Sequence, residues 1–376
     1  MILRQKGGQM KKIKRAALAF ALLLTLNACG SHQTAVTAEP SESAETTEAA
    51  SSAHEVTSSE TQAAVQQPDT SAEESTEISK HTTSRESSDS IVYFTSDISA
   101  EGLIRIYESL GWKPQGKLAV KISTGEPPAS NYLRPELIGD LVKKADGTIV
   151  ECNTAYGGSR SSAAMHKQVA EDHGFTAIAD FDLMDEEGEV EWPMTGGSRL
   201  DKVIVGSHAE NYTDWIILSH FKGHAMAGYG GAIKNVGIGI SSPSGKVYVH
   251  TAGTQTSGSI WYDDQDAWLE ALAEMVLGFS NHVGAEHIIY INVMNRLSVD
   301  CDCDGNPAEP DMHDIGILAS TDPVALDQAC IDLVYQAPDS ASLVARIERQ
   351  NGIHTLEHAE EIGLGSRTYE LVNIDD

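Results

Sequence analysis

Short apolar runs alternate with amphipathic stretches along the chain from residue 91 onward. Short apolar runs bounded by polar or turn residues are typical of buried strands, and longer stretches with one apolar face are typical of helices. We expect strands at residues 91–94, 117–122, 148–151, 202–205, 215–218, 287–293, 315–319 and 369–373. We expect helices at residues 99–110, 134–144, 161–173, 264–283, 323–335, 341–350 and 356–362.

The order of these elements indicates the fold class. Strands that alternate with helices of this length favour a largely parallel sheet covered by helices on both faces. Asp322 and Pro323 support one helix start, because an acidic cap here precedes a proline at the first helical position. The pattern predicts an α/β domain over residues 91–376, either as one body or as two lobes.

The first residues of the chain follow a different pattern. Residues 1–29 contain basic residues, then an apolar run at 16–26, and they end in Leu-Asn-Ala-Cys at 26–29. This order is typical of a secretory signal, and the apolar run is too short to remain as a membrane-spanning helix. The last four residues resemble a bacterial lipobox, in which the cysteine is lipidated. We expect Cys29 to anchor an extracytoplasmic protein to a membrane; the alternative is an ordinary cysteine near a cleavage site.

Composition then separates a linker from the domain. Residues 30–90 are mostly Ser, Thr, Ala, Glu and Gln, which cannot bury enough apolar surface to offset chain entropy, so we expect a disordered linker. The whole chain has a formal net charge of -29. Such an acidic protein repels phosphate backbones and anionic lipid headgroups, which excludes nucleic acid as a partner and leaves the lipid as the expected contact with the membrane.

A glycine-rich segment at residues 219–239 is the strongest candidate for a site. It follows the apolar run at 215–218 and contains six glycines. Its basic and amide side chains are His220, Lys222, His224, Lys234 and Asn235. Glycines add no side chain to a core, and they are used where the backbone takes positive φ or approaches another group closely. A strand followed by polar residues and a glycine-rich loop is typical of a site at the carboxyl end of a sheet strand.

Several motifs together resemble the DUF362 family, in particular the branch labelled uncharacterised iron–sulfur-centre proteins. The resemblance extends over nearly all of residues 91–376 and rests on residues 92–95, 125–127, 132–135, 153–160, 219–239, 300–303, 314–325 and 363–367. It implies a fold and a site rather than a reaction, with a redox accessory role as the associated expectation. Many members carry a ferredoxin-like insert, but residues 241–285 contain no cysteine here. An iron–sulfur cluster needs about four cysteines, so we expect none.

His220 and His224 are candidate metal ligands or acid–base groups. Two histidines four residues apart face the same side of a helix, as in many metal sites. Gly223 lies between them and a strand precedes them, so a loop is an equal alternative. The structural interpretation is that one ring packs locally while the other faces solvent.

Positively charged and amide side chains follow several of the predicted strands. Lys222, Lys234 and Asn235 would suit a phosphate or carboxylate, although the segment contains neither a phosphate-loop nor a dinucleotide fingerprint. The candidates near the ends of other strands are Lys121, Glu126, Arg134, Asn153 and Arg160. Arginine suits bidentate contacts with carboxylates or phosphates. We expect a shared crevice that binds a small anion; the alternative is a tight turn with surface ion pairs.

Four cysteines follow Cys29, and two of them lie in the segment Asp-Cys-Asp-Cys-Asp-Gly at residues 300–305. Cys301 and Cys303, helped by histidine, could bind zinc or another soft transition metal. The thiols could instead pair with each other or with another cysteine after export. Thirdly, the acidic residues imitate a calcium loop, with Pro307 and Asp311 as departures from its pattern. The sequence leaves all three interpretations open.

These observations predict a lipid-anchored extracytoplasmic protein with a metal-binding or anion-binding site at strand-end loops. Its expected cofactor is a divalent or transition metal ion. A non-catalytic binding lipoprotein and a structural surface protein are the alternatives. The sequence does not decide whether the protein is an enzyme.

Overall fold

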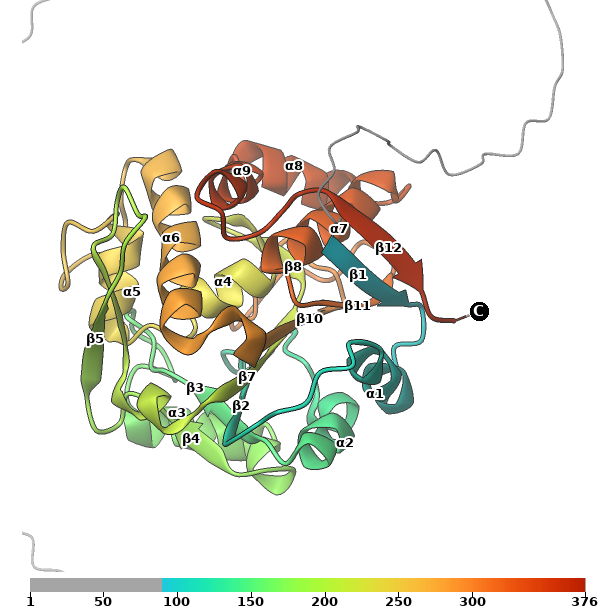
Figure 1. The fold of residues 1–376 in the computed structure, drawn as a ribbon, viewed down its shortest axis with the longest axis horizontal. Coiled ribbons are helices and arrows are strands. Elements are labelled where there is room, and N and C mark those ends of the chain that lie inside the picture. Colours follow the sequence, from blue (N-terminus) through green and yellow to red (C-terminus); the bar gives the residue numbers. More distant parts are fainter. Residues whose placement is uncertain (1–89, 376) are drawn as a thin grey trace, which may run out of the picture. The chain divides into compact units, whose positions relative to one another are not determined.

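The central element is an eight-stranded sheet, seen in a computed structural model that describes residues 90–375. The strand order is β12-β1-β11-β10-β7-β2-β3-β4, and only β11 runs antiparallel to its neighbours (Figure 1). The strands are β1 (Ser90–Thr95), β2 (Leu118–Lys121), β3 (Thr148–Glu151), β4 (Phe181–Leu183), β7 (Asp214–His220), β10 (Ile288–Met294), β11 (Gly316–Ser320) and β12 (Tyr369–Asn373). The predicted largely parallel α/β fold is confirmed.

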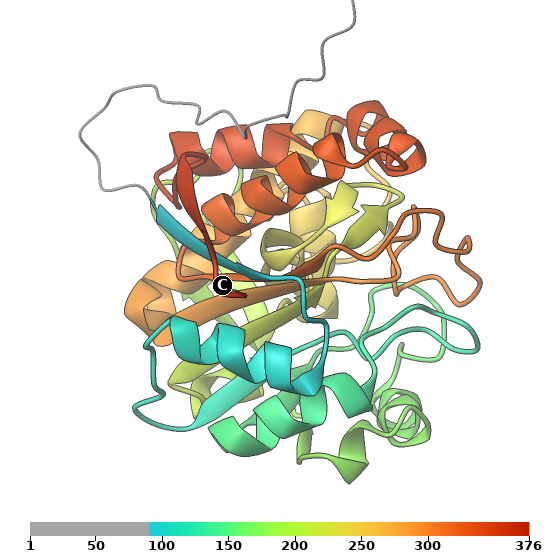
Figure 2. The same cartoon turned by 90° about the vertical axis from the view of Figure 1, so that its right-hand side faces the viewer.

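Nine helices among the described residues cover the two faces of the sheet (Figure 2). They are α1 (Ala100–Ser109), α2 (Pro135–Ala145), α3 (Ala163–Asp172), α4 (Ala232–Gly237), α5 (Pro243–His250), α6 (Gln265–Val283), α7 (Pro323–Gln336), α8 (Ala341–Arg349) and α9 (His354–Glu361). Successive strand residues point to opposite faces, so Val120 of β2 packs in the core with α1 and α2. Ala119 packs in the other core, with α4, α6 and α7. This two-sided burial explains the continuous apolar strands of the sequence.

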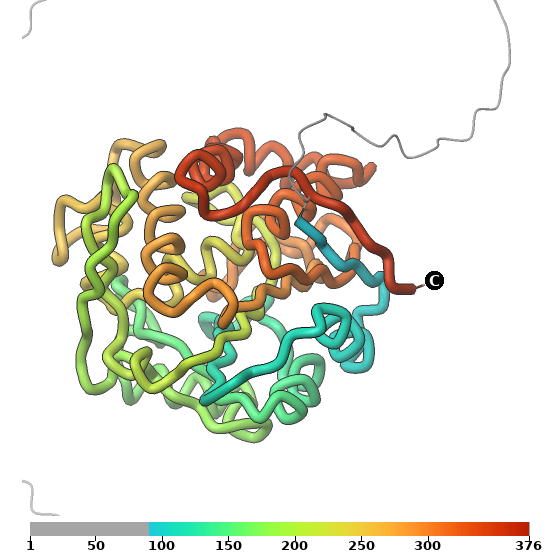
Figure 3. The backbone as a smooth tube through the Cα atoms, viewed as in Figure 1, coloured from blue at the N-terminus to red at the C-terminus, as the bar shows by residue number. Residues whose placement is uncertain are grey.

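The two ends of the described chain pair with each other. Strand β1 lies parallel to the C-terminal strand β12, with Ser90 opposite Tyr369 and Phe94 opposite Asn373 (Figure 3). The edge that β1 would otherwise expose is therefore covered. Ser90 begins β1, so one residue of the predicted linker belongs to the sheet.

Two hairpins and two helices were absent from the sequence-based prediction. The hairpins are β5 (Glu189–Pro193) with β6 (Lys202–Gly206), and β8 (Lys222–His224) with β9 (Gly228–Gly230). Of their strands, only β6 was predicted, and the short strand β4, helix α4 and helix α5 were missed as well. The missed strands β4, β5, β8 and β9 lack the continuous apolar run that marks the equally short β2, and they are too short for an alternation to be recognised. Helix α5 does carry a start signal, since Ser242 caps it and Pro243 follows.

All described residues belong to one compact unit, so the two-lobe alternative is wrong. Within residues 90–375, each helix is too short or too polar to cross a lipid bilayer. The predicted signal segment, Cys29 and residues 30–89 of the predicted linker lie outside the described residues.

Candidate functional site

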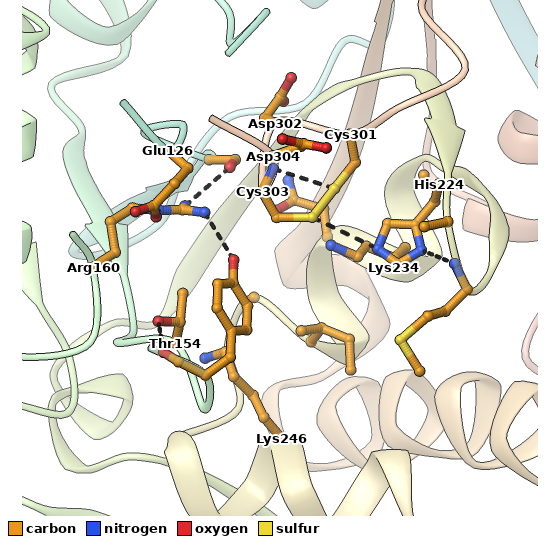
Figure 4. Close-up of a pocket in the computed structure, with 18 of the residues that line it drawn as sticks. Glu126, Thr154, Arg160, His224, Lys234, Lys246, Cys301, Asp302, Cys303 and Asp304 are labelled. Atoms are coloured by element: carbon orange, nitrogen blue, oxygen red, sulfur yellow. Dashed lines mark hydrogen bonds and ion pairs between the residues drawn. A yellow bond between two sulfur atoms is a disulfide. The ribbon is translucent and has the colours of Figure 1, made fainter. Parts of the chain in front are cut away.

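A cavity of about 570 Å³ lies at the carboxyl ends of β2, β3 and β7. Its walls come from the segments that follow these strands and from the segment after β10 (Figure 4). Strands β2 and β7 are neighbours, and the chain continues from β2 to β3 on one side and from β7 to β10 on the other. Open α/β sheets bind ligands at such a point, because the connections diverge there and leave a crevice.

One side of the cavity is a closed network of ion pairs. The Lys121 ammonium, 1 % exposed, lies 3.7 Å from Glu151, and Arg160 lies at the same distance from this carboxylate. Arg160 also pairs with Glu126 at 3.1 Å, and His166 contacts Glu151 at 2.9 Å. Burial alone would raise the pKa of Glu151, but Lys121, His166 and Arg160 hold this pKa well below its usual value. The predicted residues Lys121, Glu126 and Arg160 are therefore neutralised within a network whose centre, Glu151, was not predicted.

Asn235 joins the elements around this network. Its amide nitrogen donates to the carbonyl oxygens of Lys121 and Leu218 and to the Ser219 hydroxyl, and its oxygen accepts from the Lys121 ammonium. Strand β2, strand β7 and helix α4 are thus linked by one side chain. Asn235 fixes the geometry of the pocket floor.

A second network surrounds Asp302. Its carboxylate lies 2.8 Å from Nδ1 of His220 and 2.9 Å from the Lys222 ammonium. Burial would raise the pKa of Asp302, but His220 and Lys222 keep it far below its usual value. Nε2 of His220 also bonds the carbonyl oxygen of Asn295 at 2.6 Å. Both ring nitrogens of His220 and the Lys222 charge therefore have partners within the protein.

The two histidines lie on strands, so both the helix and the loop expected for them are wrong. His220 ends β7 because the ladder with β10 continues as far as Val293, and His224 ends β8. Gly223, between them, lies against the backbone of Val299, where an added Cβ would come within 2.2 Å of the carbonyl oxygen. This contact brings the segment after β10 onto the hairpin.

That contact places the two cysteines beside His224. Cys301 and Cys303 form a disulfide, and Nε2 of His224 lies 4.0 Å from Sγ of Cys303. Both cysteines line the cavity; Cys301 is 4 % exposed, whereas Cys303 is partly exposed. Ligand atoms of His224, Cys301 and Cys303 all lie within 4.8 Å of one another. With the disulfide reduced, this group could hold a metal ion.

The acidic residues of the same segment do not converge. Asp300 pairs with Arg346 at 3.1 Å, while Asp302 faces His220 and Lys222. Calcium is normally held by several carboxylate and carbonyl oxygens around one point. The geometry therefore favours the disulfide among the three interpretations of the sequence.

Lys234 differs from the other basic residues of the pocket. Within residues 90–375, no hydrogen bond or ion pair engages its ammonium group, although it lines the cavity beside the disulfide (Figure 4). Burial, together with the charges of Lys222, Lys121 and Arg160, lowers the pKa of Lys234 to about 7. A charge in this position is suited to an anionic ligand.

The sequence-based prediction also named residues outside the cavity and missed others inside it. Arg134 does not line the cavity, and its guanidinium lies 3.9 Å from the ring centre of Tyr132. Asn153 is not in the lining either, although both its neighbours are. The missed residues include Glu151, Lys246, His250 and Trp261. Lys246 and His250 lie on the unpredicted helix α5, whose Ser242-Pro243 start was the signal available.

Comparisons with known proteins assign this chain to a family. A distant likeness is found to the lactate racemase apoprotein from Thermoanaerobacterium thermosaccharolyticum, with 13% sequence identity, a TM-score of 0.41 and coverage of 65% of this chain and 57% of that chain. A structural-genomics protein from Thermotoga maritima gives 12% identity, a TM-score of 0.35 and coverage of 70% and 58%. This chain thus spans less than two thirds of either structure, and no curated protein matches it. The model described as "Domain of unknown function (DUF362)" matches residues 118–332, and the chain therefore belongs to the DUF362 family.

Proposed function

We propose that this protein is a lipid-anchored, extracytoplasmic binding protein whose strand-end pocket holds a small anion with a carboxylate or phosphate group. The observation that carries this proposal is Lys234, whose charge points into the cavity without a partner among the described residues. Placing a charge where it is partly removed from water is unfavourable unless an opposite charge compensates it. A bound anion would supply that compensation.

The rest of the pocket supports a ligand of this kind. A volume of about 570 Å³ lies within the range of small-molecule sites. His250 is 6 % exposed in the cavity wall, and its Nδ1 has no hydrogen-bond partner among residues 90–375. Lys121, Lys222 and Arg160 are already paired, so they would contribute to the field around the ligand while Lys234 makes the direct contact.

The location outside the cytoplasm rests on the sequence and on the disulfide. Residues 1–29 have the pattern of a lipoprotein signal, with Cys29 as the site of the lipid. The Cys301–Cys303 disulfide is the form that cysteines adopt in oxidising compartments. The membrane is the proposed partner, through the lipid, and the net charge of -29 argues against nucleic acid.

A thermal-unfolding assay with and without malonate or inorganic phosphate tests the binding proposal. We expect a saturable rise in Tm of about 2 °C or more with at least one anion, because a ligand that binds only the folded state stabilises it. Malonate and phosphate distinguish a carboxylate ligand from a phosphate ligand. The rise should disappear in Lys234→Met and remain in Lys167→Met, a matched change at an exposed lysine of α3.

An equal rise in the wild type and in Lys234→Met would show that the anions act elsewhere. The absence of any rise for both anions would contradict the proposal and would favour a structural surface protein.

Metal binding is a second candidate function, supported by the distances among His224, Cys301 and Cys303. It requires two thiolates, so only the reduced protein should bind, and zinc should bind better than calcium. We expect one zinc ion per chain by elemental analysis after anaerobic reduction, and loss of zinc in Cys303→Ser. The matched control is Cys330→Ser, which removes a buried thiol on α7. Retention of zinc by Cys303→Ser would contradict this candidate.

A further inference from the structure

The disulfide is placed for attack from the cavity at one of its two sulfur atoms. Both cysteines line the pocket, but Cys301 is only 4 % exposed, whereas Cys303 is partly exposed. Thiol–disulfide exchange requires an incoming thiolate to reach a sulfur atom, so accessibility selects which sulfur is attacked. A small thiol that enters this cavity would meet Sγ of Cys303 first.

Hydrogen-bond donors are already directed at both sulfur atoms. The backbone N–H of Cys303 donates to Sγ of Cys301 at 3.2 Å. Nδ1 of His224 accepts from the backbone N–H groups of Met226 and Ala227, at 3.1 and 2.9 Å. A neutral imidazole with an accepting Nδ1 carries its proton on Nε2, and Nε2 is the atom 4.0 Å from Sγ of Cys303. Each cysteine therefore has a donor that would stabilise its thiolate.

We propose that this pair is a redox-active dithiol that exchanges with a low-molecular-mass thiol bearing carboxylate groups. In the first step the thiolate of this compound bonds to Sγ of Cys303. The Cys301–Cys303 bond breaks, and its electron pair passes to Sγ of Cys301, which the Cys303 N–H stabilises. The product of this step is a mixed disulfide at Cys303 and a thiolate at Cys301.

The second step regenerates the free pocket. A second molecule of the thiol attacks the small-molecule sulfur of the mixed disulfide and leaves as a symmetrical disulfide. Cys303 departs as a thiolate beside the His224 N–H. The protons of the two thiols finally reside on the two cysteines, so one protein disulfide and two thiols give one protein dithiol and one small disulfide. The reverse sequence reduces the small disulfide.

The carboxylate requirement follows from Lys234, which lies on the same side of the cavity as the disulfide (Figure 4). This part of the inference rests on the proposed anion-binding function. The exchange itself depends only on Cys301, Cys303 and His224. A compound with both a thiol and a carboxylate would use the reactive sulfur and the free ammonium at once.

The test isolates Cys303 in the variant Cys301→Ser and follows its reaction with glutathione disulfide by intact-protein mass spectrometry, with a chelator present. We expect one glutathione adduct, mapped to Cys303. The matched variant Cys303→Ser should react more slowly by about tenfold or more, because Cys301 is 4 % exposed. Cys330 is buried outside the cavity lining and serves as the internal control that stays unmodified.

Uncharged 2-hydroxyethyl disulfide separates exchange from anion recognition. In the Cys301→Ser background, Lys234→Met should slow the reaction with glutathione disulfide about tenfold, the equivalent of about 1.4 kcal/mol. Its rate with the uncharged disulfide should stay within about twofold. Equal rates with both probes in both backgrounds would overturn the carboxylate requirement while leaving exchange in place.

The wild-type protein provides a measurement that does not depend on a variant. With excess reduced glutathione, alkylation should find Cys301 and Cys303 free, with one equivalent of glutathione disulfide formed per chain. A native disulfide that resists glutathione, together with an unreactive Cys303 in Cys301→Ser, would overturn the exchange activity. Stabilisation by malonate could persist in that case, so failure of the exchange is distinguishable from failure of the anion site.

Discussion

Two charged side chains on neighbouring helices, Glu274 of α6 and Lys234 of α4, have opposite environments. Glu274 is fully buried, and its carboxylate accepts hydrogen bonds from three successive backbone N–H groups at residues 198–200. Nε2 of His358 lies 3.1 Å away. Burial alone would raise the pKa of Glu274, but His358 and the backbone donors lower it to about 2. Lys234 has no such partner in the part of the chain that the structure describes.

The difference separates a structural charge from a binding charge. Partners that the fold itself provides make the Glu274 carboxylate part of the framework that joins α6 to α9 and to the segment before β6. The partner of Lys234 would have to come from outside the protein. A buried charge with all its partners therefore indicates a structural role, and one without them indicates a ligand.

The largest expected loss of stability follows from removal of the structural charge, Glu274. Glu274→Ala should lower the free energy of unfolding by about 3–5 kcal/mol, because it leaves several buried donors without an acceptor. Urea unfolding monitored by circular dichroism measures this change. The control Glu270→Ala, one turn earlier on α6, should cost only about 1 kcal/mol, since its partners Arg199 and His354 are 40 % and 25 % exposed. Similar losses for both variants would remove the distinction between them.

A smaller effect is expected at the partner of this carboxylate. The hydrogen bond to Glu274 raises the pKa of His358 in the folded protein. The stability contributed by protonated His358 is therefore complete below the unfolded pKa of about 6.5 and is lost as pH rises through the folded pKa. His358→Asn should therefore lower the free energy of unfolding by about 1–2 kcal/mol at pH 5.5. The loss should shrink by pH 9. His313→Asn changes an exposed ion pair and should have little effect at either pH.

Removal of the binding charge, Lys234, should change the free energy of unfolding in the opposite direction. Lys234→Met should raise the free energy of unfolding by about 1 kcal/mol at pH 6, because an uncompensated charge leaves the pocket. Burial lowers the folded pKa of Lys234 to about 7 from its ordinary value of 10.5, so the unfolded chain binds more protons between these two pH values. Wild-type stability should therefore rise relative to the variant across that range. A constant difference from pH 6 to pH 11 would contradict the lowered pKa.

The smallest effect on stability is expected at the mouth of the pocket. Trp261 is 73 % exposed and lines the cavity, so Trp261→Ala should change the free energy of unfolding by less than about 0.5 kcal/mol. It should nevertheless remove any change in tryptophan fluorescence that malonate produces in the wild type. Trp112→Ala, outside the pocket, should leave this fluorescence response intact. Persistence of the response in Trp261→Ala would place the ligand away from the mouth.

The helices and strands that the sequence predicted are those with a continuous apolar run or a long amphipathic pattern. Strand β3 was predicted with its observed bounds, and β7 and α6 to within two residues at either end. A run buried on both faces or an amphipathic stretch of nineteen residues is visible without knowledge of its neighbours. The hairpin β8–β9 has no such signal. Its three-residue strands pair with each other and are held in place by α8 and the segment after β10.

The sequence by itself determined the family resemblance, the fold class and the location of a site near residues 219–239. Apolar runs, helix starts and clustered glycines are local properties of the chain, and Gly223 is indeed required by a close backbone approach. Only the tertiary structure decided which charge remains free. Lys222 is neutralised by Asp302, eighty residues further along, whereas Lys234 finds no partner within residues 90–375. Charge compensation depends on distances of a few ångströms between segments that are remote in sequence, and packing sets those distances.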